Sequence, residues 1–171
     1  RGRGTQMNAG AAVARGDVLL FLHADTRLPD DADSLVLDGL ARSGRAWGRF
    51  AVQIAGSHPL LPVVARMMNL RSRLSGIATG DQAMFMRRQA FLQAGGFPDL
   101  PLMEDVAMSR RLKRISPPLC LRARVTTSGR RWERNGLWRT VWLMWRLRLA
   151  FFLGAEPARL AREYGYVPRQ P

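Results

Sequence analysis

An apolar run that ends on an imidazole and a carboxylate is the first place in this chain where residue types could do chemistry. Residues 17–23 form that near-continuous run, which is typical of a strand covered on both faces in a parallel sheet. His23 and Asp25 stand at its carboxyl end, where ligands bind in open α/β sheets. Asp25 offers a hard oxygen ligand for Mg²⁺ or Mn²⁺, and His23 adds a nitrogen, which suits Mn²⁺ better. A strand-end histidine and an aspartate in a turn explain the same residues equally well.

A second acidic pair, Glu104 and Asp105, opens a predicted helix. The helix macrodipole favours anions at such a position, so two N-terminal capping acids account for the pair without any function. A functional interpretation makes one of them a general base, which requires a carboxylate held near a substrate hydroxyl. Both interpretations stay open.

Two further polar segments flank predicted strands. Gly80, Asp81 and Gln82 come directly before a strand, and a turn explains the first two. The last strand is followed by the basic and aromatic residues Arg130, Arg131, Trp132 and Arg134. Arginines beside a tryptophan can clamp a diphosphate. They can equally form a solvated basic loop or contact a nucleic-acid backbone.

The spacing of apolar residues predicts strands and helices in alternation. The predicted helices cover residues 5–15, 29–41, 62–74, 88–97, 103–114, 136–153 and 157–163. The predicted strands cover residues 17–23, 47–56, 82–88 and 119–127. This alternation favours a layered α/β domain with a mostly parallel sheet and flanking helices.

Composition bounds the class of protein. The 171 residues are 47% hydrophobic and 23% charged, as expected of one globular domain. Basic residues outnumber acidic ones by 27 to 13, and a net charge of +14 favours anionic partners. The single cysteine, Cys120, excludes an internal disulfide and favours a reducing compartment, the cytoplasm. The sequence contains no run of eighteen uninterrupted apolar residues, so no ordinary transmembrane helix is expected.

The predicted helix over 136–153 is apolar nearly all round. Arg139 and Arg146 share one face by helical spacing, and Arg148 lies opposite. Its three arginines argue against a membrane-spanning role. Its tryptophans suit a membrane interface or a partner surface, while burial against the domain fits as well.

Taken together, the ordered motifs resemble family-2 glycosyltransferases. The segment GRGTQMNAGAAVARGDVLLFLHADT resembles the family's asparagine-bearing helix, apolar strand and Asp-x-Asp motif. The segment GDQAMFMRRQAFLQAGGFPDLPLMEDVAMSRRLKR resembles its next block. LFLHADTRLP, TGDQAMF and RRWERNG together are similar to a bacterial subgroup labelled transferase 2, associated with radical-SAM/selenoprotein gene neighbourhoods. The resemblance covers residues 2–164.

This resemblance implies a GT-A-type nucleotide-diphospho-sugar transferase fold and an inverting, metal-dependent sugar transfer to an acceptor hydroxyl. It implies that Asp25, with His23 in place of the first aspartate of Asp-x-Asp, holds Mn²⁺ or Mg²⁺ on the donor diphosphate. It makes Asp105 the catalytic base, with Glu104 beside it. The substrate-binding residues it implies are Gly80, Asp81, Gln82, Arg131 and Trp132.

The sequence departs from the family's pattern at two points, and the second affects the expected domain organisation. Ser128 stands where the glutamine of the family's Gln-x-x-Arg-Trp motif would be, which argues against processive polymer synthesis. The family's N-terminal half-fold has no counterpart in this sequence, so an N-terminally truncated domain is expected. We therefore expect a catalytic portion over 1–135 and an aromatic helical extension over 136–171.

The expected partners follow from the same resemblance. They are a nucleotide-diphospho-sugar donor and an acceptor of unknown identity, with a lipid-linked acceptor among the candidates. Residues 136–153 are a candidate for peripheral contact with the inner face of the cell membrane. No nucleic acid is expected, because the aromatic residues do not interleave with the basic ones. The alternative function is a non-catalytic basic module that binds nucleic acid or a membrane surface.

Overall fold

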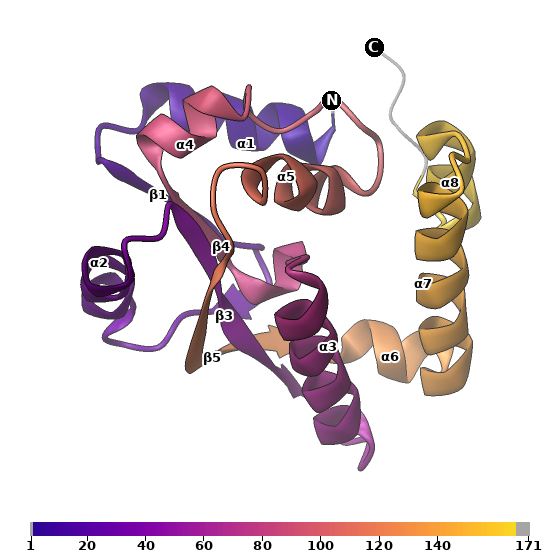
Figure 1. Ribbon diagram of the computed structural model, residues 1–171. Helices are drawn as coiled ribbons and strands as arrows, with labels where there is room; N and C mark the ends of the chain where they lie inside the picture. The colour runs from indigo at the N-terminus through magenta and orange to yellow at the C-terminus, as the bar shows by residue number, and fades with distance from the viewer. Residues whose placement is uncertain (1, 167–171) are drawn as a thin grey trace.

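Among residues 2–166, which the computed structural model describes, five strands form one curled sheet (Figure 1). The strands are β1 (Val18–Phe21), β2 (Thr26–Arg27), β3 (Trp47–Ala55), β4 (Met84–Arg87) and β5 (Leu119–Ser128). Their hydrogen-bonded order is β1-β4-β3-β5-β2. The helices are α1 (Arg3–Val13), α2 (Ala32–Ser43), α3 (Leu61–Ser75), α4 (Arg88–Gln93), α5 (Glu104–Leu112), α6 (Arg130–Asn135), α7 (Leu137–Phe152) and α8 (Pro157–Glu163), with a 3₁₀ turn η1 (Gly80–Gln82).

The prediction of a mostly parallel sheet is wrong. In the described part of the chain β3 and β5 pair in parallel, whereas β1–β4, β3–β4 and β2–β5 are antiparallel. A helix between two strands does not determine at which end of the sheet the second strand begins. Here β4 starts opposite Arg49, within β3, and runs back along it. The prediction that β1 is covered in a parallel sheet is also wrong, because within residues 2–166 β1 is an edge strand that pairs only with β4, in antiparallel orientation.

Helix positions agree much better with prediction. Helix α8 spans the predicted residues 157–163, and α3 covers 61–75 against the predicted 62–74. Both have a proline in the first turn, and α3 ends at Gly76 in the left-handed conformation. After the last strand, where a solvated basic loop was one of the expectations, the chain forms helix α6. It is too short to show a helical period in sequence, and burial of Trp132 anchors it.

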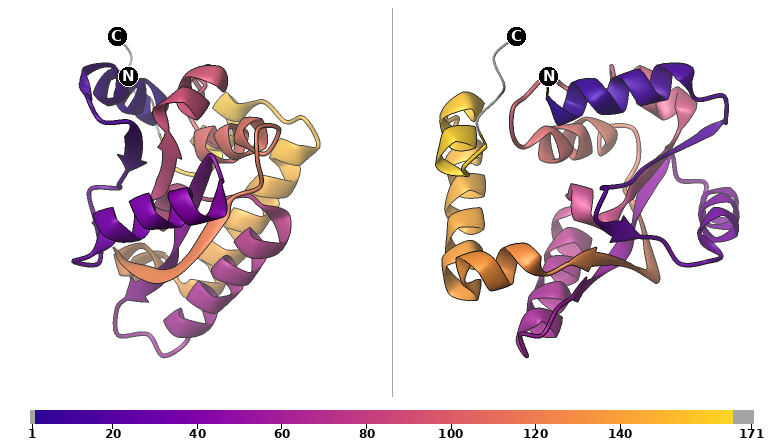
Figure 2. Two further views of the ribbon diagram at one scale, coloured as in Figure 1. Left: turned by 60° about the vertical axis from the view of Figure 1, so that its left-hand side comes forward. Right: turned by 180° about the vertical axis from the view of Figure 1, so that it is seen from behind.

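Three apolar clusters hold the described elements together. The first packs α2 and α3 around Phe50 and Val52 of β3, and the second packs α1, α4 and α5 over β1 and β4 around Met108. The third joins α5 to α7 and α8 through Val106 and Leu147. Figure 2 shows the result: α7 and α8 stand along one side of the molecule, connected through α6. One side of α5 therefore faces α7.

Helix α7 is buried on one side and exposed on the other. Leu137, Thr140 and Leu147 are buried, whereas Trp138, Trp142 and Trp145 are each more than half exposed. Within residues 2–166, no helix has the length and apolar character needed to cross a membrane. Contact of α7 with a membrane surface stays a prediction.

The side chain of Asn69, on α3, makes hydrogen bonds to the backbone of β3 that a neighbouring strand would otherwise make. Its side-chain oxygen accepts a hydrogen bond from the Val52 backbone N–H at 2.8 Å, and its amide donates to the Val52 carbonyl at 2.9 Å. The same oxygen accepts a bond from the Gln82 amide at 3.3 Å. The asparagine thus pairs the backbone of a buried strand residue and ties η1 to α3.

We expect Asn69→Ala to lower the free energy of unfolding by about 2–4 kcal/mol, because it leaves the buried backbone groups of Val52 without partners. Urea denaturation followed by circular dichroism would measure the change. Asn135→Ala, at an exposed position, is the matched control. Equal unfolding midpoints for the two variants would contradict the role given to Asn69.

Candidate active site

A cavity of about 70 Å³ brings together polar side chains from both ends and the middle of the chain. It lies where η1, the start of α5 and the inner face of α7 meet. The polar residues that line it are Arg3, His23, Thr79, Asp81, Asp105, Arg148 and Tyr164, with Gly80 between them. Four residues singled out in the sequence therefore share one cavity: His23, Gly80, Asp81 and Asp105.

His23 is directed at η1. Its Nδ1 lies 3.3 Å from a carboxylate oxygen of Asp81, and a methyl group added at Gly80 would overlap its Nε2. Glycine at position 80 is therefore a condition for this packing. The hydrogen bond to Asp81 raises the pKa of His23 against the opposing effect of burial. Burial alone would raise the pKa of Asp81, but the bond and charge of His23, with Arg148, hold it below its usual value.

This pair predicts a pH dependence of stability. The raised pKa of His23 contributes stability that is complete below its ordinary value of 6.5 and is lost as the pH rises through the folded value. The lowered pKa of Asp81 contributes stability above its ordinary value of 3.8 that is lost as the pH falls through the folded value. Between these limits we expect His23→Gln to be less stable than wild type by about 1 kcal/mol.

Thermal unfolding of wild type and His23→Gln from pH 4 to pH 9 would measure this difference. The gap is expected to shrink as the pH rises through the raised pKa of His23, where the imidazole loses its proton. His58→Gln serves as the control, because His58 lies outside the cavity. A gap that is constant across the pH range would show that the His23–Asp81 pair is not charged.

The two acids at the start of α5 have different surroundings. Asp105 lines the cavity, where its Oδ2 accepts a hydrogen bond from the Gly80 N–H at 2.9 Å and its Oδ1 accepts one from the Val106 N–H at 2.7 Å. Glu104 is only 1% exposed and forms an ion pair with Arg3 at 2.9 Å. Burial and the neighbouring charge of Asp105 raise the pKa of Glu104 even though Arg3 opposes them. Asp105 is therefore the carboxylate that is available to a ligand. Glu104 instead holds α1 in place through its ion pair with Arg3.

The backbone on both sides of the cavity is strained. Within residues 2–166, the non-glycine residues with positive φ are Ala83, at 45°, and Met103, at 67°. Ala83 follows η1 and Met103 precedes Glu104 and Asp105. Such residues each cost about 1–3 kcal/mol and persist where the surrounding packing imposes them, often at functional sites. Here they set the directions in which η1 and α5 approach each other.

The asparagine of α1 holds the loop that leads into α5. The amide of Asn8 donates to the carbonyl of Phe97 at 2.8 Å, and its side-chain oxygen accepts a bond from the Phe97 N–H at 2.9 Å. Thr5 donates to Asp99 at 3.1 Å in the same loop. Since this loop continues to Met103 and Asp105, α1 helps to position the carboxylate from a distance.

Asp25 lies outside the cavity, in the turn between β1 and β2. The Thr26 N–H donates to the His23 carbonyl at 3.0 Å across that turn, and Asp25 is exposed. No hydrogen bond or ion pair of the Asp25 side chain occurs within residues 2–166, and no group of three or more His, Cys, Asp or Glu side chains in that range could hold a metal ion. One free carboxylate still suits a metal whose other ligands are waters and substrate phosphates.

The remaining predicted substrate-binding residues do not line the cavity. Gln82 is fully buried and accepts a bond from the Thr79 N–H at 3.3 Å. Trp132 is buried in the first core cluster. Arg131 stacks 3.7 Å from the ring centroid of Tyr164 and donates to its carbonyl at 3.2 Å, so it supports a residue of the cavity wall.

Four of the polar lining residues were not predicted from the sequence: Arg3, Thr79, Arg148 and Tyr164. A signal was present for Arg148, since helical spacing puts it opposite the exposed Arg139 and Arg146. Arg3 and Tyr164 lie near the ends of the chain, and no local pattern indicates that they meet.

Comparisons with known proteins support the fold. No family model and no curated protein sequence matches the chain. Among solved structures, the chain is similar to the mannosyltransferase PcManGT from Pyrobaculum calidifontis in complex with GDP-Man and Mn²⁺, with 16% identity and a TM-score of 0.53. The match covers 97% of this chain and 49% of that one, so the chain spans about half the length of that protein. The fold is therefore glycosyltransferase-like.

Proposed function

We propose that this chain is the catalytic portion of a glycosyltransferase that moves a sugar from a nucleotide-diphospho-sugar to an acceptor hydroxyl with inversion. The observation that carries the proposal is the cavity in which the carboxylate of Asp105 lies together with Arg3 and Arg148. The glycosyltransferase-like fold supports it. Assignment to family 2 and to its bacterial subgroup rests on the sequence motifs.

In the proposed reaction Asp105 accepts the proton of the acceptor hydroxyl. The acceptor oxygen then forms a bond to the anomeric carbon as the bond from that carbon to the donor diphosphate breaks. The electron pair of the broken bond leaves with the nucleoside diphosphate. Arg3 is a cationic group of the cavity that offsets this charge. Gly80 and Asp81 border the sugar.

A divalent ion would be held by Asp25 together with oxygens of the donor diphosphate. Bound there, the ion would offset negative charge on the leaving group. Both ring nitrogens of His23 face protein groups, so the imidazole would have to turn before it could act as the second protein ligand. We assign it instead to positioning Asp81.

We propose further that the chain consists of a catalytic portion over 1–135 and a helical extension over 136–171. Arg148 and Tyr164 line the cavity, so the helical extension contributes to the proposed site and does more than cover the catalytic portion. Arg131 has a supporting role through Tyr164.

The test is calorimetric titration of the chain with UDP and GDP, with and without Mn²⁺. Mn²⁺-dependent binding of either nucleotide would support the proposal. The net charge of +14 favours the alternative of a basic binding module. Binding of duplex DNA that ignores Mn²⁺ and falls steeply with salt, without any nucleotide binding, would overturn the proposal in favour of that alternative.

A further inference from the structure

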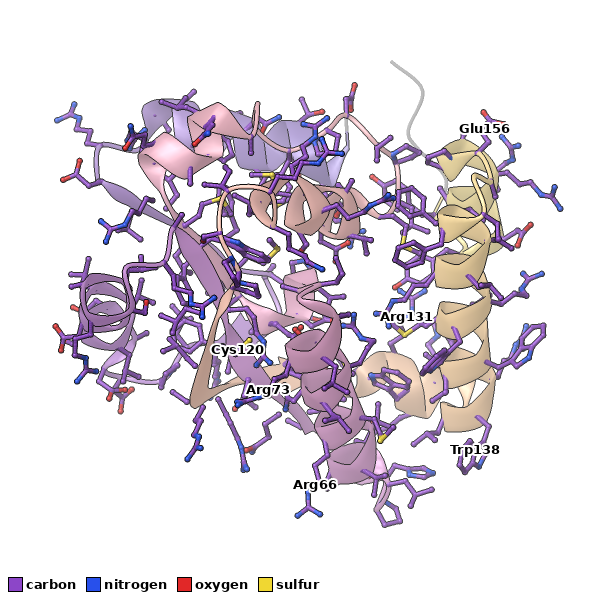
Figure 3. All side chains as sticks on the ribbon, in the orientation of Figure 1. Arg66, Arg73, Cys120, Arg131, Trp138 and Glu156 are labelled. Carbon is purple, nitrogen blue, oxygen red and sulfur yellow. The ribbon has the colours of Figure 1, made fainter. Side chains whose placement is uncertain are left out.

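A long apolar groove runs between α3 and α7, beside the cavity. Its volume is about 650 Å³, within the range of roughly 300–1,000 Å³ that is common for small-molecule sites. Figure 3 shows that side chains of both helices project into the space between them. Its walls are formed mainly by Val63, Met67, Leu70 and Leu74 of α3 and by Trp138 and Trp145 of α7.

These wall residues are unusually exposed for apolar side chains. Met67 is 55% exposed, Leu74 78% and Trp138 72%. A continuous apolar surface of this kind marks a binding site more often than it marks an unused surface. The groove therefore offers a site for a long apolar ligand.

One part of the groove carries positive charge and connects it to the proposed active site. Arg71 and Arg148 line the groove, and Arg148 and Met144 line the cavity as well. Arg71 donates through Nη1 to the carbonyl of Ile77 at 3.2 Å, but its Nε and Nη2 are buried without a hydrogen-bond partner within residues 2–166. Burial and the like charge of Arg148 lower the pKa of Arg71 to about 10, so it stays cationic at neutral pH.

Buried guanidinium N–H groups without acceptors are costly, and an anion would supply the missing acceptors. Arg148 lines both the groove and the cavity that contains Asp105, so an anion bound beside Arg148 lies close to the proposed base. A second copy of this chain suits the groove poorly, because it would bring a net charge of +14 toward these arginines.

We propose that the groove binds the acceptor of the reaction, an amphiphile with one long hydrocarbon chain and a phosphate headgroup that carries a hydroxyl. The chain lies between α3 and α7, the phosphate lies between Arg71 and Arg148, and the hydroxyl reaches Asp105. The role as acceptor rests on the proposed glycosyltransferase function, whereas binding of the amphiphile does not.

The test is a titration of the whole chain with palmitoyl lysophosphatidylglycerol, kept below its critical micelle concentration. Binding is measured by the change in tryptophan fluorescence. Glycerophosphoglycerol, which lacks the hydrocarbon chain, and palmitoyl lysophosphatidylcholine, which lacks the net negative charge, separate the two contributions. We expect lysophosphatidylglycerol to bind at least about tenfold more tightly than either of them. Equal binding of the two lysolipids would overturn the assignment of the phosphate to the arginines.

Two variants locate the site. Met67→Asp changes an exposed groove residue and is expected to weaken binding by about tenfold or more. Leu37→Asp makes the same change at an equally exposed residue of α2 outside the groove, and should leave binding unchanged. Arg71→Gln should remove the preference for the anionic lysolipid. Unchanged binding in Met67→Asp, or a dimer in sedimentation that excludes the lipid, would overturn the proposal.

Titration of the same preparations with UDP and GDP in the presence of Mn²⁺ separates this inference from the proposed function. Nucleotide binding without lysolipid binding would overturn the groove assignment and leave the glycosyltransferase proposal standing. Lysolipid binding without nucleotide binding would overturn the acceptor role and the glycosyltransferase proposal together, while supporting the groove as an amphiphile site.

Discussion

Asp105→Asn is expected to reduce sugar transfer by about 10²–10⁴-fold, the usual contribution of a positioned general base. An amide cannot accept the proton of the acceptor hydroxyl. Its oxygen can still accept the hydrogen bond from the Gly80 N–H, which Asp105 accepts at 2.9 Å, so η1 keeps its place, while the bond from the Val106 N–H to the other oxygen is lost. Nucleotide affinity should therefore change little, and the loss should appear in the rate of transfer.

Release of nucleoside diphosphate in the presence of donor and acceptor would measure the rate, and calorimetry would measure nucleotide affinity. Asp38→Asn removes an exposed carboxylate of α2 and controls for the change in net charge. Retention of more than about a tenth of the wild-type rate by Asp105→Asn would remove Asp105 from the role of base.

Asp25→Ala is expected to abolish the Mn²⁺-dependent part of UDP or GDP binding, with a loss of affinity of at least about 10–100-fold. Asp25 is exposed and its side chain makes no hydrogen bond or ion pair in the described part of the chain. Its removal should therefore leave the thermal unfolding temperature unchanged. A loss of nucleotide binding could then be attributed to the metal and not to misfolding.

Asp30→Ala is the matched control, since Asp30 is exposed and lies close to Asp25 in the sequence, between β2 and α2. Calorimetric titrations of both variants with and without Mn²⁺ would separate a metal ligand from a general effect of charge. Equal Mn²⁺-dependent binding in wild type and Asp25→Ala would place the metal elsewhere or remove it from the proposal.

Helices are the part of this fold that could be predicted from the sequence. The limits of α8, and those of α3 to within one residue, follow from apolar spacing and from a proline or glycine at an end. These signals act over one or two turns, so they do not depend on the rest of the molecule. Strand direction is different. The antiparallel start of β4 opposite Arg49 depends on the course of residues 76–83, which no local pattern contains.

The candidate site divides in the same way. Residue types and motif order selected His23, Gly80, Asp81 and Asp105, which share the cavity. They also selected Trp132, which the structure buries in a core cluster because α6 turns it inward. A motif specifies which side chain is present, but the direction of that side chain depends on the element that carries it.

The sequence by itself determined the chemistry that this chain can offer: carboxylates at two element ends, a glycine before a strand and an excess of arginine. The tertiary structure alone decided which of these groups meet. Arg3 and Tyr164 reach the cavity from opposite ends of the chain, and the apolar cluster that contains Val106 and Leu147 brings Arg148 to it. Helical and strand periods arise between neighbours along the chain, whereas a cavity arises from contacts between distant elements, so only the packed structure reveals it.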